Sequence, residues 1–496
     1  MNIFKTLFRR AGRESDPVDA FHPQTIIRDF GNGDAFRIED AVTGTFICGG
    51  TGSGKTSGPG ASFATGCLAA GMGGVVLCAK PDECARWKKW LIEAGREEDL
   101  VIFDGVGTYC YNFIACEANR TSAGGGFAAN VVSILHQMAA AVGRASGQSD
   151  KGGGDSKFWE EALRLLLNNL VSLPLLAGLE VSIPLLRSLL NAAPQSLAQV
   201  SDPAWQENSL CAAMLREADK ATMDARDPYL RADFEECRSY ILNDLAQLSE
   251  KTRSIIVLTF TILAHSFVTS PLRKLFCSDT NITPEDTFNG KVVVIDLPVQ
   301  SYGVVGKVAA LTWKLNFQAA VLRRTPPPGG YLRPVFLWAD ECHLFTTEGD
   351  AEYQATARSA GGCTFYLTQN REILRHALGN ADAVDALLGN LQNKVLCQNG
   401  SVDTNEFFAK LLGERWVNVT STNVGHSYSQ MPNQNAGVSR AEQRRFFVEP
   451  SRFTTLKRGG ESNNYFVECF IYNGGRLFTR GSEMLPYRLL TFNQLA

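Results

Sequence analysis

One glycine-rich segment near the start of the chain, residues 49–56 (GGTGSGKT), constrains the fold more than any other. It fits the pattern G-x-x-x-x-G-K-[S/T], follows a short apolar stretch at residues 44–48 and precedes a segment of helical composition at residues 57–71. In such a strand, loop and helix unit, the glycines let consecutive backbone N–H groups turn inward around a phosphate. The segment therefore predicts a phosphate-binding loop in an α/β domain.

The loop supplies the predicted nucleotide-binding residues. Lys55 is placed to reach the β- and γ-phosphates, and the Thr56 hydroxyl is placed to ligate Mg²⁺. We therefore expect ATP and Mg²⁺ as cofactors. The full predicted set is Gly49, Gly50, Thr51, Gly52, Ser53, Gly54, Lys55, Thr56 and Ser57.

Strands and helices alternate around this loop, which is typical of a parallel sheet flanked by helices. Apolar strands are predicted at residues 44–48, 74–78 and 100–103, and again at 291–297, 335–338, 364–367 and 394–398. The block between the two groups has helical periodicity, so we expect an all-helical domain inserted into one nucleotide-binding domain. The predicted units are an N-terminal tail (1–40), the first part of the nucleotide-binding domain (41–117), the inserted helical domain (118–277) and the second part (278–496).

A paired acidic motif follows the strand at residues 334–341 (PVFLWADE). Asp340 is the predicted Mg²⁺ partner, and Glu341 is the predicted catalytic base that orients and deprotonates a water molecule. A pair of carboxylates capping a helix would look the same in isolation. Beside a phosphate loop, paired acids after a strand favour a hydrolytic motor over a kinase.

Two further residues are predicted to act on the γ-phosphate. Gln369 ends the strand in residues 364–370 (TFYLTQN) and is placed as a sensor of that phosphate, with a helix-capping role as the alternative. Arg358 precedes this strand and is the candidate arginine finger, which would reach the site of a neighbouring subunit. An ordinary surface arginine is its alternative.

Composition narrows the class of protein. The 496 residues carry 48 Lys and Arg against 51 Asp and Glu, a net charge of -3, so any contact with DNA must be local. Thirteen cysteines without CxxC spacing are expected to be reduced thiols, and the isolated histidines give no metal-site pattern. The longest apolar runs, 128–142 and 255–268, are shorter than a membrane span and are expected to be buried helices, so no integral span is predicted.

Three further segments have less regular patterns. Residues 418–444, rich in Ser, Asn and Gln, are predicted to be a surface loop. Phe446 and Phe447 follow two arginines and fit either base stacking or a strand that enters the core. The first 13 residues could form a short basic amphipathic helix or a frayed tail.

Several motifs, in order, resemble the type IV coupling proteins, the TraG/TraD-type conjugative DNA-transfer ATPases. They extend over almost the whole chain: Lys80-Pro81-Asp82-Glu83, Asp104 with Tyr111-Asn112, Phe158-Trp159, residues 290–294 (GKVVV), Asp340-Glu341, Thr368-Gln369, and Asp403-Thr404 with residues 411–413 (LLG). The resemblance implies a RecA-like hexameric motor whose inserted helical domain receives the substrate or relaxosome. In the family the trans-acting arginine stands about eleven residues before the sensing Gln, where Arg358 stands here.

The function expected from these features is an Mg²⁺-ATP-hydrolysing homohexamer that moves DNA, or a protein–DNA substrate, through a central pore. Relaxosome or secretion-channel proteins are the further partners that the resemblance implies. One alternative is a nucleotide-dependent receptor that recruits a secretion substrate, and another is a cytosolic DNA-pumping ATPase in defence against, or maintenance of, mobile elements. Family members usually begin with transmembrane helices, whereas only a short segment precedes the motor here. The expected form therefore lacks these helices and is cytoplasmic or peripheral to the inner membrane.

Overall fold

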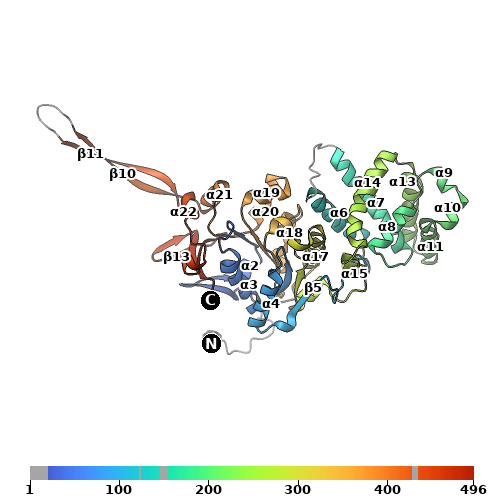
Figure 1. Ribbon diagram of the computed structural model, residues 1–496, viewed down its shortest axis with the longest axis horizontal. Coiled ribbons are helices and arrows are strands. Elements are labelled where there is room, and N and C mark those ends of the chain that lie inside the picture. The colour runs from blue at the N-terminus through green and yellow to red at the C-terminus, as the bar shows by residue number, and fades with distance from the viewer. Residues whose placement is uncertain (1–20, 122–124, 146–154, 427–433, 496) are drawn as a thin grey trace.

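A nine-stranded sheet forms the centre of the molecule, which we describe from a computed structural model (Figure 1). The structure describes residues 21–121, 125–145, 155–426 and 434–495. The strand order is β15-β12-β9-β3-β8-β7-β4-β6-β5. The strands are β3 (Thr45–Cys48), β4 (Gly73–Leu77), β5 (Leu100–Asp104), β6 (Val292–Asp296), β7 (Val335–Ala339), β8 (Gly362–Thr368), β9 (Asn393–Leu396), β12 (Phe466–Asn473) and β15 (Tyr487–Asn493).

The strands from β9 to β5 in this order are all parallel, and β12 and β15 add an antiparallel edge. Every residue of β3, β4, β7, β8 and β9 is buried. Continuous apolar strands of this kind belong in a sheet whose two faces are both covered. All seven strands predicted from the sequence are present.

Helices cover both faces of the sheet, because alternate residues of each strand point into different cores. In β3, Phe46 and Cys48 join one core, whereas Ile47 joins the other. The Ile47 side is covered by α3 (Ala61–Ala69) and α4 (Glu83–Glu93). The opposite side is covered by α17 (Val304–Leu322), α18 (Asp350–Thr356), α19 (Arg371–Leu378) and α20 (Ala381–Asn390).

The described residues of the chain between β5 and β6 form helices joined by turns and loops and contain no strand, and this part extends to the right of the sheet in Figure 1. Its longest helices are α6 (Ala128–Ala145), α7 (Asp155–Leu176), α11 (Leu210–Asp224), α12 (Pro228–Ser239) and α14 (Glu250–Val268). The shorter ones are α5 (Phe113–Ala118), α8 (Ile183–Ala192), α9 (Leu197–Val200), α10 (Pro203–Asn208), α13 (Leu245–Gln247) and α15 (Leu272–Phe276). This part of the chain is the block that the sequence predicts to be an inserted domain.

Helix α14 is the one described helix long and apolar enough to cross a membrane by length and composition. Only 28% of its most apolar window is buried, which corrects the prediction of a buried helix at residues 255–268. One face, which includes Phe260 and Phe267, packs in the core, whereas Leu258 and Ile262 are exposed. Length and composition alone are weak evidence for a membrane span, because the core helix of a water-exposed domain can meet the same criteria.

A long hairpin corrects the prediction of a surface loop at residues 418–444. Strands β10 (Glu414–His426) and β11 (Gln434–Phe446) pair antiparallel over their whole length and project from the body at the left of Figure 1. The prediction failed because neither face is buried at residues 414–422 and 438–446, where side-chain burial is described, so the alternation of apolar and polar residues that marks a half-buried strand is weak. Phe446 and Phe447 are half-buried where the ribbon joins the body, and Phe447 packs edge-on against Tyr487.

The predicted N-terminal tail is also partly structured. Strands β1 (Ile26–Gly31) and β2 (Asp34–Arg37) form a hairpin, followed by the short helix α2 (Ile38–Ala41). Arg488 of β15 donates to the carbonyls of Phe30 and Gly31, which ties this hairpin to the edge of the sheet. The predicted amphipathic helix at residues 1–13 lies outside the described residues.

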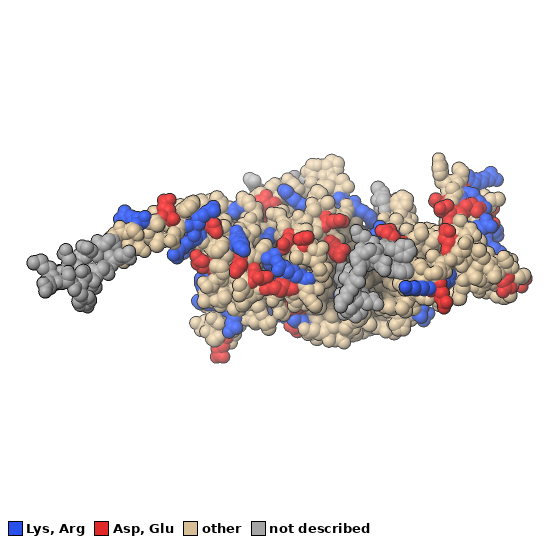
Figure 2. Space-filling view, turned by 90° about the horizontal axis from the view of Figure 1, so that it is seen from above, with Lys and Arg blue, Asp and Glu red and all other residues tan. Residues whose placement is uncertain are grey.

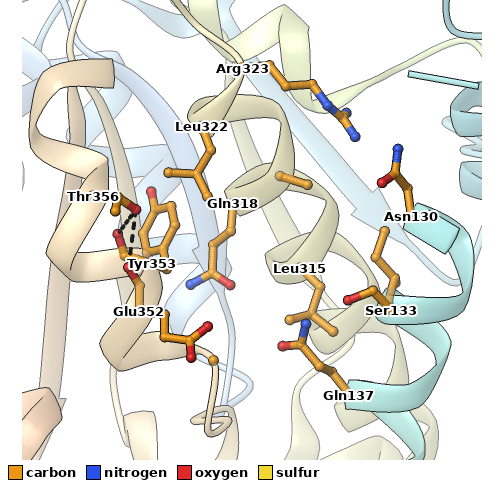
Figure 3. A pocket seen from close by; sticks show the side chains of 13 residues that line it. Asn130, Ser133, Gln137, Leu315, Gln318, Leu322, Arg323, Glu352, Tyr353 and Thr356 are labelled. Carbon is orange, nitrogen blue, oxygen red and sulfur yellow. Dashed lines mark hydrogen bonds between the residues drawn. The ribbon is translucent and has the colours of Figure 1, made fainter. Parts of the chain in front are cut away.

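The helical part meets the sheet part at a cavity of about 400 Å³ (Figure 3). Helix α6 lines one side with Asn130, Ser133 and Gln137, and α17 and α18 line the other. Near one end, the Arg323 guanidinium makes two bonds to the buried Glu117 carboxylate, at 2.9 and 2.6 Å. The cavity lies at the junction of the two parts, and its lining includes no residue of the phosphate loop.

A fully buried ion pair joins α17 to α18 behind this cavity. Lys314 Nζ lies 2.6 Å from Asp350 Oδ2, and the two side chains are 0% and 1% exposed. Lys314 also donates to the Phe345 carbonyl, while Gln318 donates to the second oxygen of Asp350 at 2.9 Å. Burial lowers the pKa of Lys314, although Asp350 opposes the shift. The pair holds the first residue of α18 in place, and Arg358 follows shortly after the end of this helix.

Removing one partner of this pair is expected to destabilise the protein strongly. Asp350→Ala leaves Lys314 buried without its counter-charge, a change that costs about 3–5 kcal/mol in comparable pairs. Urea unfolding followed by circular dichroism should show a lower midpoint for Asp350→Ala than for Asp233→Ala, which removes an exposed carboxylate on α12. The double variant Lys314→Met/Asp350→Leu should recover most of the loss. Equal midpoints for Asp350→Ala and Asp233→Ala would show that the pair does not stabilise the fold.

Candidate functional site

Parallel pairing brings the predicted phosphate loop and the acidic motif to the same edge of the sheet. Strand β8 lies between β3 and β7, with Cys48 opposite Thr368 and Ala339 opposite Tyr366. The residues after the three strands therefore meet at the carboxyl edge, where open α/β sheets bind ligands. Gly49 begins the loop with a hydrogen bond from its N–H to the Thr368 carbonyl at 3.2 Å.

The glycine-rich loop has a backbone that only glycine adopts without strain at two positions. Gly52 and Gly54 have φ values of 71° and 80°, in the left-handed region. A Cβ on Gly54 would lie 2.4 Å from Cγ2 of Val467 on β12, so the loop is also packed closely from behind. Beyond Lys55 the chain turns at once into η1 (Thr56–Gly60) and α3, which places a helix N-terminus at the loop.

The loop and the acidic motif are in direct contact. Thr56 Oγ1 donates to Asp340 Oδ2 at 2.7 Å. The backbone N–H of Glu341 donates to the other oxygen, Asp340 Oδ1, at 2.9 Å, which fixes the carboxylate. The two predicted Mg²⁺ ligands therefore stand side by side, although they come from segments 284 residues apart in the sequence.

Two lysines hold Glu341 in its ionised form. Lys80 Nζ lies 2.8 Å and Lys55 Nζ 3.5 Å from the same oxygen, Glu341 Oε1. Burial alone would raise the pKa of Glu341, but the charges of Lys55 and Lys80 outweigh it and lower the pKa below its usual value. Glu341 has φ of 52°, a left-handed conformation that costs a non-glycine residue about 1–2 kcal/mol. Such strain is often retained at functional sites.

Lys80 and Glu83 are site residues to which sequence reasoning assigned no role. They follow β4, which pairs with β7, so they arrive at the same edge beside Asp340 and Glu341. Burial raises the pKa of Glu83 to about 8, and the Asp340 charge adds to the rise. The signal in the sequence is the charged run at residues 80–83 (KPDE) directly after a predicted strand.

His343 also lies at this edge. Its Nδ1 is 3.8 Å from Glu341 Oε2 and 3.5 Å from the Thr368 hydroxyl. Burial lowers the pKa of His343, so the imidazole is neutral at neutral pH. The described residues contain no cluster of three His, Cys, Asp or Glu side chains that could hold a metal ion. All thirteen cysteines are free thiols, as expected.

Gln369 and Arg358 lie at opposite ends of β8. The Gln369 carbonyl accepts hydrogen bonds from Asn399 Nδ2 at 2.8 Å and from the Cys48 thiol at 3.3 Å, so Gln369 stands beside the loop. Arg358 is exposed on η6 (Ala357–Ala360), before the strand begins. The seven residues of β8 separate the two by about 23 Å at 3.3 Å per residue. The structure therefore brings Lys55, Thr56, Asp340, Glu341 and Gln369 together, and it leaves Arg358 on a different edge.

The donor set at this edge suits a nucleotide with Mg²⁺. Backbone N–H groups at a helix N-terminus and Lys55 suit phosphates, and a hydroxyl beside a carboxylate suits a hard cation that keeps several waters. The buried hydroxyl of Ser53 and Oε2 of Glu341 have no hydrogen-bond partner within the described residues. Such polar atoms, aimed into a site, are consistent with a polar ligand.

Comparison with known proteins agrees with the fold. Residues 334–458 match a family model described as the TraM recognition site of TraD and TraG. The solved structure of the bacterial conjugative coupling protein TrwBdeltaN70 is similar over 97% of this chain and 90% of its own, with a TM-score of 0.59 and 15% identity. No curated protein matches the sequence.

Two further TrwB structures contain ligands. One is a complex with the non-hydrolysable ATP analogue ADPNP, covering 95% of this chain and 90% of that one at a TM-score of 0.56 and 16% identity. The other is a complex with ADP and Mg²⁺, covering 95% and 88% at 0.53 and 16%.

These findings confirm the predicted fold class, a RecA-like α/β fold with a mostly parallel central sheet flanked by helices. The family model matched by residues 334–458 and the similarity in fold to TrwBdeltaN70 both agree with the resemblance to TraG/TraD-type coupling proteins seen in the sequence motifs.

Proposed function

We propose that this chain is an Mg²⁺-dependent ATP hydrolase that assembles as a homohexamer and uses hydrolysis to move DNA in conjugation or a related process. The observation that carries the proposal is the convergence of Lys55, Thr56, Asp340 and Glu341 at one edge of the sheet. The TrwB complexes with ADPNP and with ADP and Mg²⁺, on the same fold, support the choice of ligand. The inserted helical block, residues 118–277, is proposed as the domain that receives the substrate.

Each side chain has a distinct proposed role. The loop from Gly49 to Ser57 binds the phosphates, with Lys55 on the β- and γ-phosphates, and Thr56 and Asp340 hold Mg²⁺. When bound, this ion neutralises charge on the phosphate oxygens. Glu341 orients a water molecule and accepts its proton, which requires the ionised carboxylate that Lys80 and Lys55 maintain. Gln369, beside the loop, contacts the γ-phosphate.

Arg358 acts in a neighbouring subunit. It is exposed and about 23 Å along β8 from Gln369, which is too far to reach phosphates bound in its own chain. In a ring, the nucleotide site of one subunit lies at the interface with the next subunit. An exposed arginine at the opposite edge of that next subunit's sheet can therefore complete the site. This arrangement supports a ring rather than an active monomer.

The presence of single- or double-stranded DNA at low salt should stimulate ATP hydrolysis by the wild-type chain. Lys55→Ala should abolish both basal and stimulated hydrolysis, because the phosphates lose the cation placed to reach them. A phosphate-release assay with and without DNA, repeated at rising salt, measures both effects, and stimulation should fall steeply with salt. Full hydrolysis by Lys55→Ala would refute the assignment of the site.

A receptor that recruits a protein or protein–DNA substrate is the second candidate, favoured by the match of residues 334–458 to a region described by its recognition of TraM. Hydrolysis would then reset the receptor rather than move DNA. Assembled hexamers that hydrolyse ATP without any stimulation by DNA would favour this candidate.

Arg358→Ala should lose hydrolysis while it still binds ATP. Arginine fingers contribute about 10³–10⁵-fold to the rate where they have been measured. Arg480→Ala, which removes another exposed arginine, is the control and should hydrolyse ATP normally. Mixing Arg358→Ala with Lys55→Ala subunits should restore part of the activity, because one intact site can receive the arginine of its neighbour. Normal hydrolysis by Arg358→Ala would place the finger elsewhere.

Lys80→Met should shift the pH dependence of hydrolysis. The charge of Lys80 lowers the pKa of Glu341, so its removal raises that pKa and moves the acid limb of kcat/KM to higher pH. The rate at neutral pH should fall by no more than the roughly 10²–10⁴-fold that general-base catalysis supplies. Lys89→Met, at a 72% exposed side chain on α4, should leave the profile unchanged. An unshifted acid limb in Lys80→Met would show that Lys80 does not control the base.

A further inference from the structure

The hairpin formed by β10 and β11 carries an excess of positive charge in a chain that is negative overall. Its described side chains, at residues 414–422 and 438–446, include four arginines and two glutamates. The arginines are Arg415, Arg440, Arg444 and Arg445, and all four are exposed. Figure 2 shows blue side chains along the described part of the hairpin, which projects from the left of the body.

Two of these arginines face each other across the ladder. Arg415 and Arg445 are a directly opposed pair, so their side chains leave the same face of the ribbon. Like charges directly opposite one another destabilise a two-stranded sheet. An isolated hairpin is marginal at best in water. A bound anion would relieve this repulsion.

An exposed aromatic ring lies on the adjacent pair. Trp416 is 65% exposed and is opposed by Arg444, whose guanidinium carbon is 5.6 Å from the indole centroid. Flat aromatic rings flanked by arginine are the elements that proteins use to stack the bases of single-stranded nucleic acids. Successive pairs leave opposite faces, so Trp416 and Arg444 lie on the other face from Arg415 and Arg445, across a ribbon only two strands wide, about 4.8 Å between backbones.

The rest of the described surface of the ribbon, at residues 414–422 and 438–446, is poorly suited to a protein partner. Among its described side chains only Trp416 and Val438 are large, apolar and exposed. Protein interfaces are depleted in charge at their centre and enriched in several aromatic residues or methionines. Hydroxyl and amide side chains, among them Asn418, Thr420 and Ser439, fill most of the rest and can donate to phosphate oxygens.

Helix α21 (Val402–Leu412) connects the hairpin to the segment that touches the phosphate loop. Strand β10 begins directly after α21, which starts next to residues 398–400. The Gly50 N–H donates to the Gln398 carbonyl at 2.8 Å, and Asn399 donates to the Gln369 carbonyl. A force that a bound ligand exerts on the hairpin would therefore be transmitted through α21 to residues 398–400, which touch both the phosphate loop and Gln369.

We propose that the root of this hairpin binds single-stranded nucleic acid, with a base stacked on Trp416 and phosphates paired with the arginines around it. This inference rests on the proposed function and names one surface through which the motor would contact DNA.

The test uses the full chain and a fluorescently labelled oligothymidylate, with affinity measured by anisotropy over a series of salt concentrations. Trp416→Ala should weaken binding by roughly 5- to 140-fold, the value of one stacked base, whereas Trp416→Phe should retain most of it. Arg415→Gln/Arg445→Gln should reduce the slope of log affinity against log salt by about 1.4, at about 0.7 per phosphate contact. Arg415→Lys/Arg445→Lys should retain the slope, because the charges remain. Basal ATP hydrolysis should be unchanged in all four variants.

Two results would overturn the inference. Wild-type binding together with unchanged affinity and salt slope in Trp416→Ala and Arg415→Gln/Arg445→Gln would show that DNA binds elsewhere. Loss of the assembled state in these variants, measured by light scattering, with unchanged DNA affinity would show that the hairpin is an arm that grips a second copy of the chain. If the wild-type chain itself neither binds the oligonucleotide nor responds to it, the proposed motor function fails as well, so the two failures are distinguishable.

Discussion

The parallel pairing of β8 between β3 and β7 is the constraint on which the rest of the site depends. It aligns the ends of three strands, so the phosphate loop, Gln369 and the acidic pair meet at one edge. A slip of one residue in this register would turn the alternating side chains of β8 to the wrong faces of a sheet that is buried on both sides. The same strand separates Arg358 from Gln369, so one pairing brings the phosphate loop and the acidic pair together and keeps Arg358 at the opposite edge of the sheet.

The charges at the site are arranged in buried pairs. Lys55 and Lys80 face Asp340 and Glu341, and all of these side chains are buried except that of Lys80, which is partly exposed. The third carboxyl group, Glu83, has a pKa raised to about 8 by burial and by Asp340, so it is mostly neutral at neutral pH. Neighbouring carboxyl groups whose pKa values are pushed apart can take different roles. Here Glu341 is ionised and suited to accept a proton, while the neutral Glu83 avoids a third buried negative charge.

Much of this architecture could be predicted from the sequence because the physical signals are strong. Continuous apolar strands predicted the sheet, and the glycine pattern with its flanking strand predicted the loop. The sequence did not assign a role in the site to Lys80. That role depends on which strands are neighbours in the sheet, and local residue spacing does not reveal the strand order. The hairpin at residues 414–446 was not predicted because neither of its faces is buried at residues 414–422 and 438–446, although its run of β-branched residues such as Val417 and Val419 favours a strand. The partial exposure of α14 depends on tertiary packing, which its composition does not reveal.

The close contact between Gly54 and Val467 has a consequence for how the protein is made. The phosphate loop is encoded in the first eighth of the chain, but β12, which packs behind it, is encoded near the end. The strands on both sides of β3 are also translated late, at residues 362–368 and 393–396. During synthesis the loop therefore has neither its flanking strands nor its backing at first, so a loop of this shape can form only after β8, β9 and β12 have been translated.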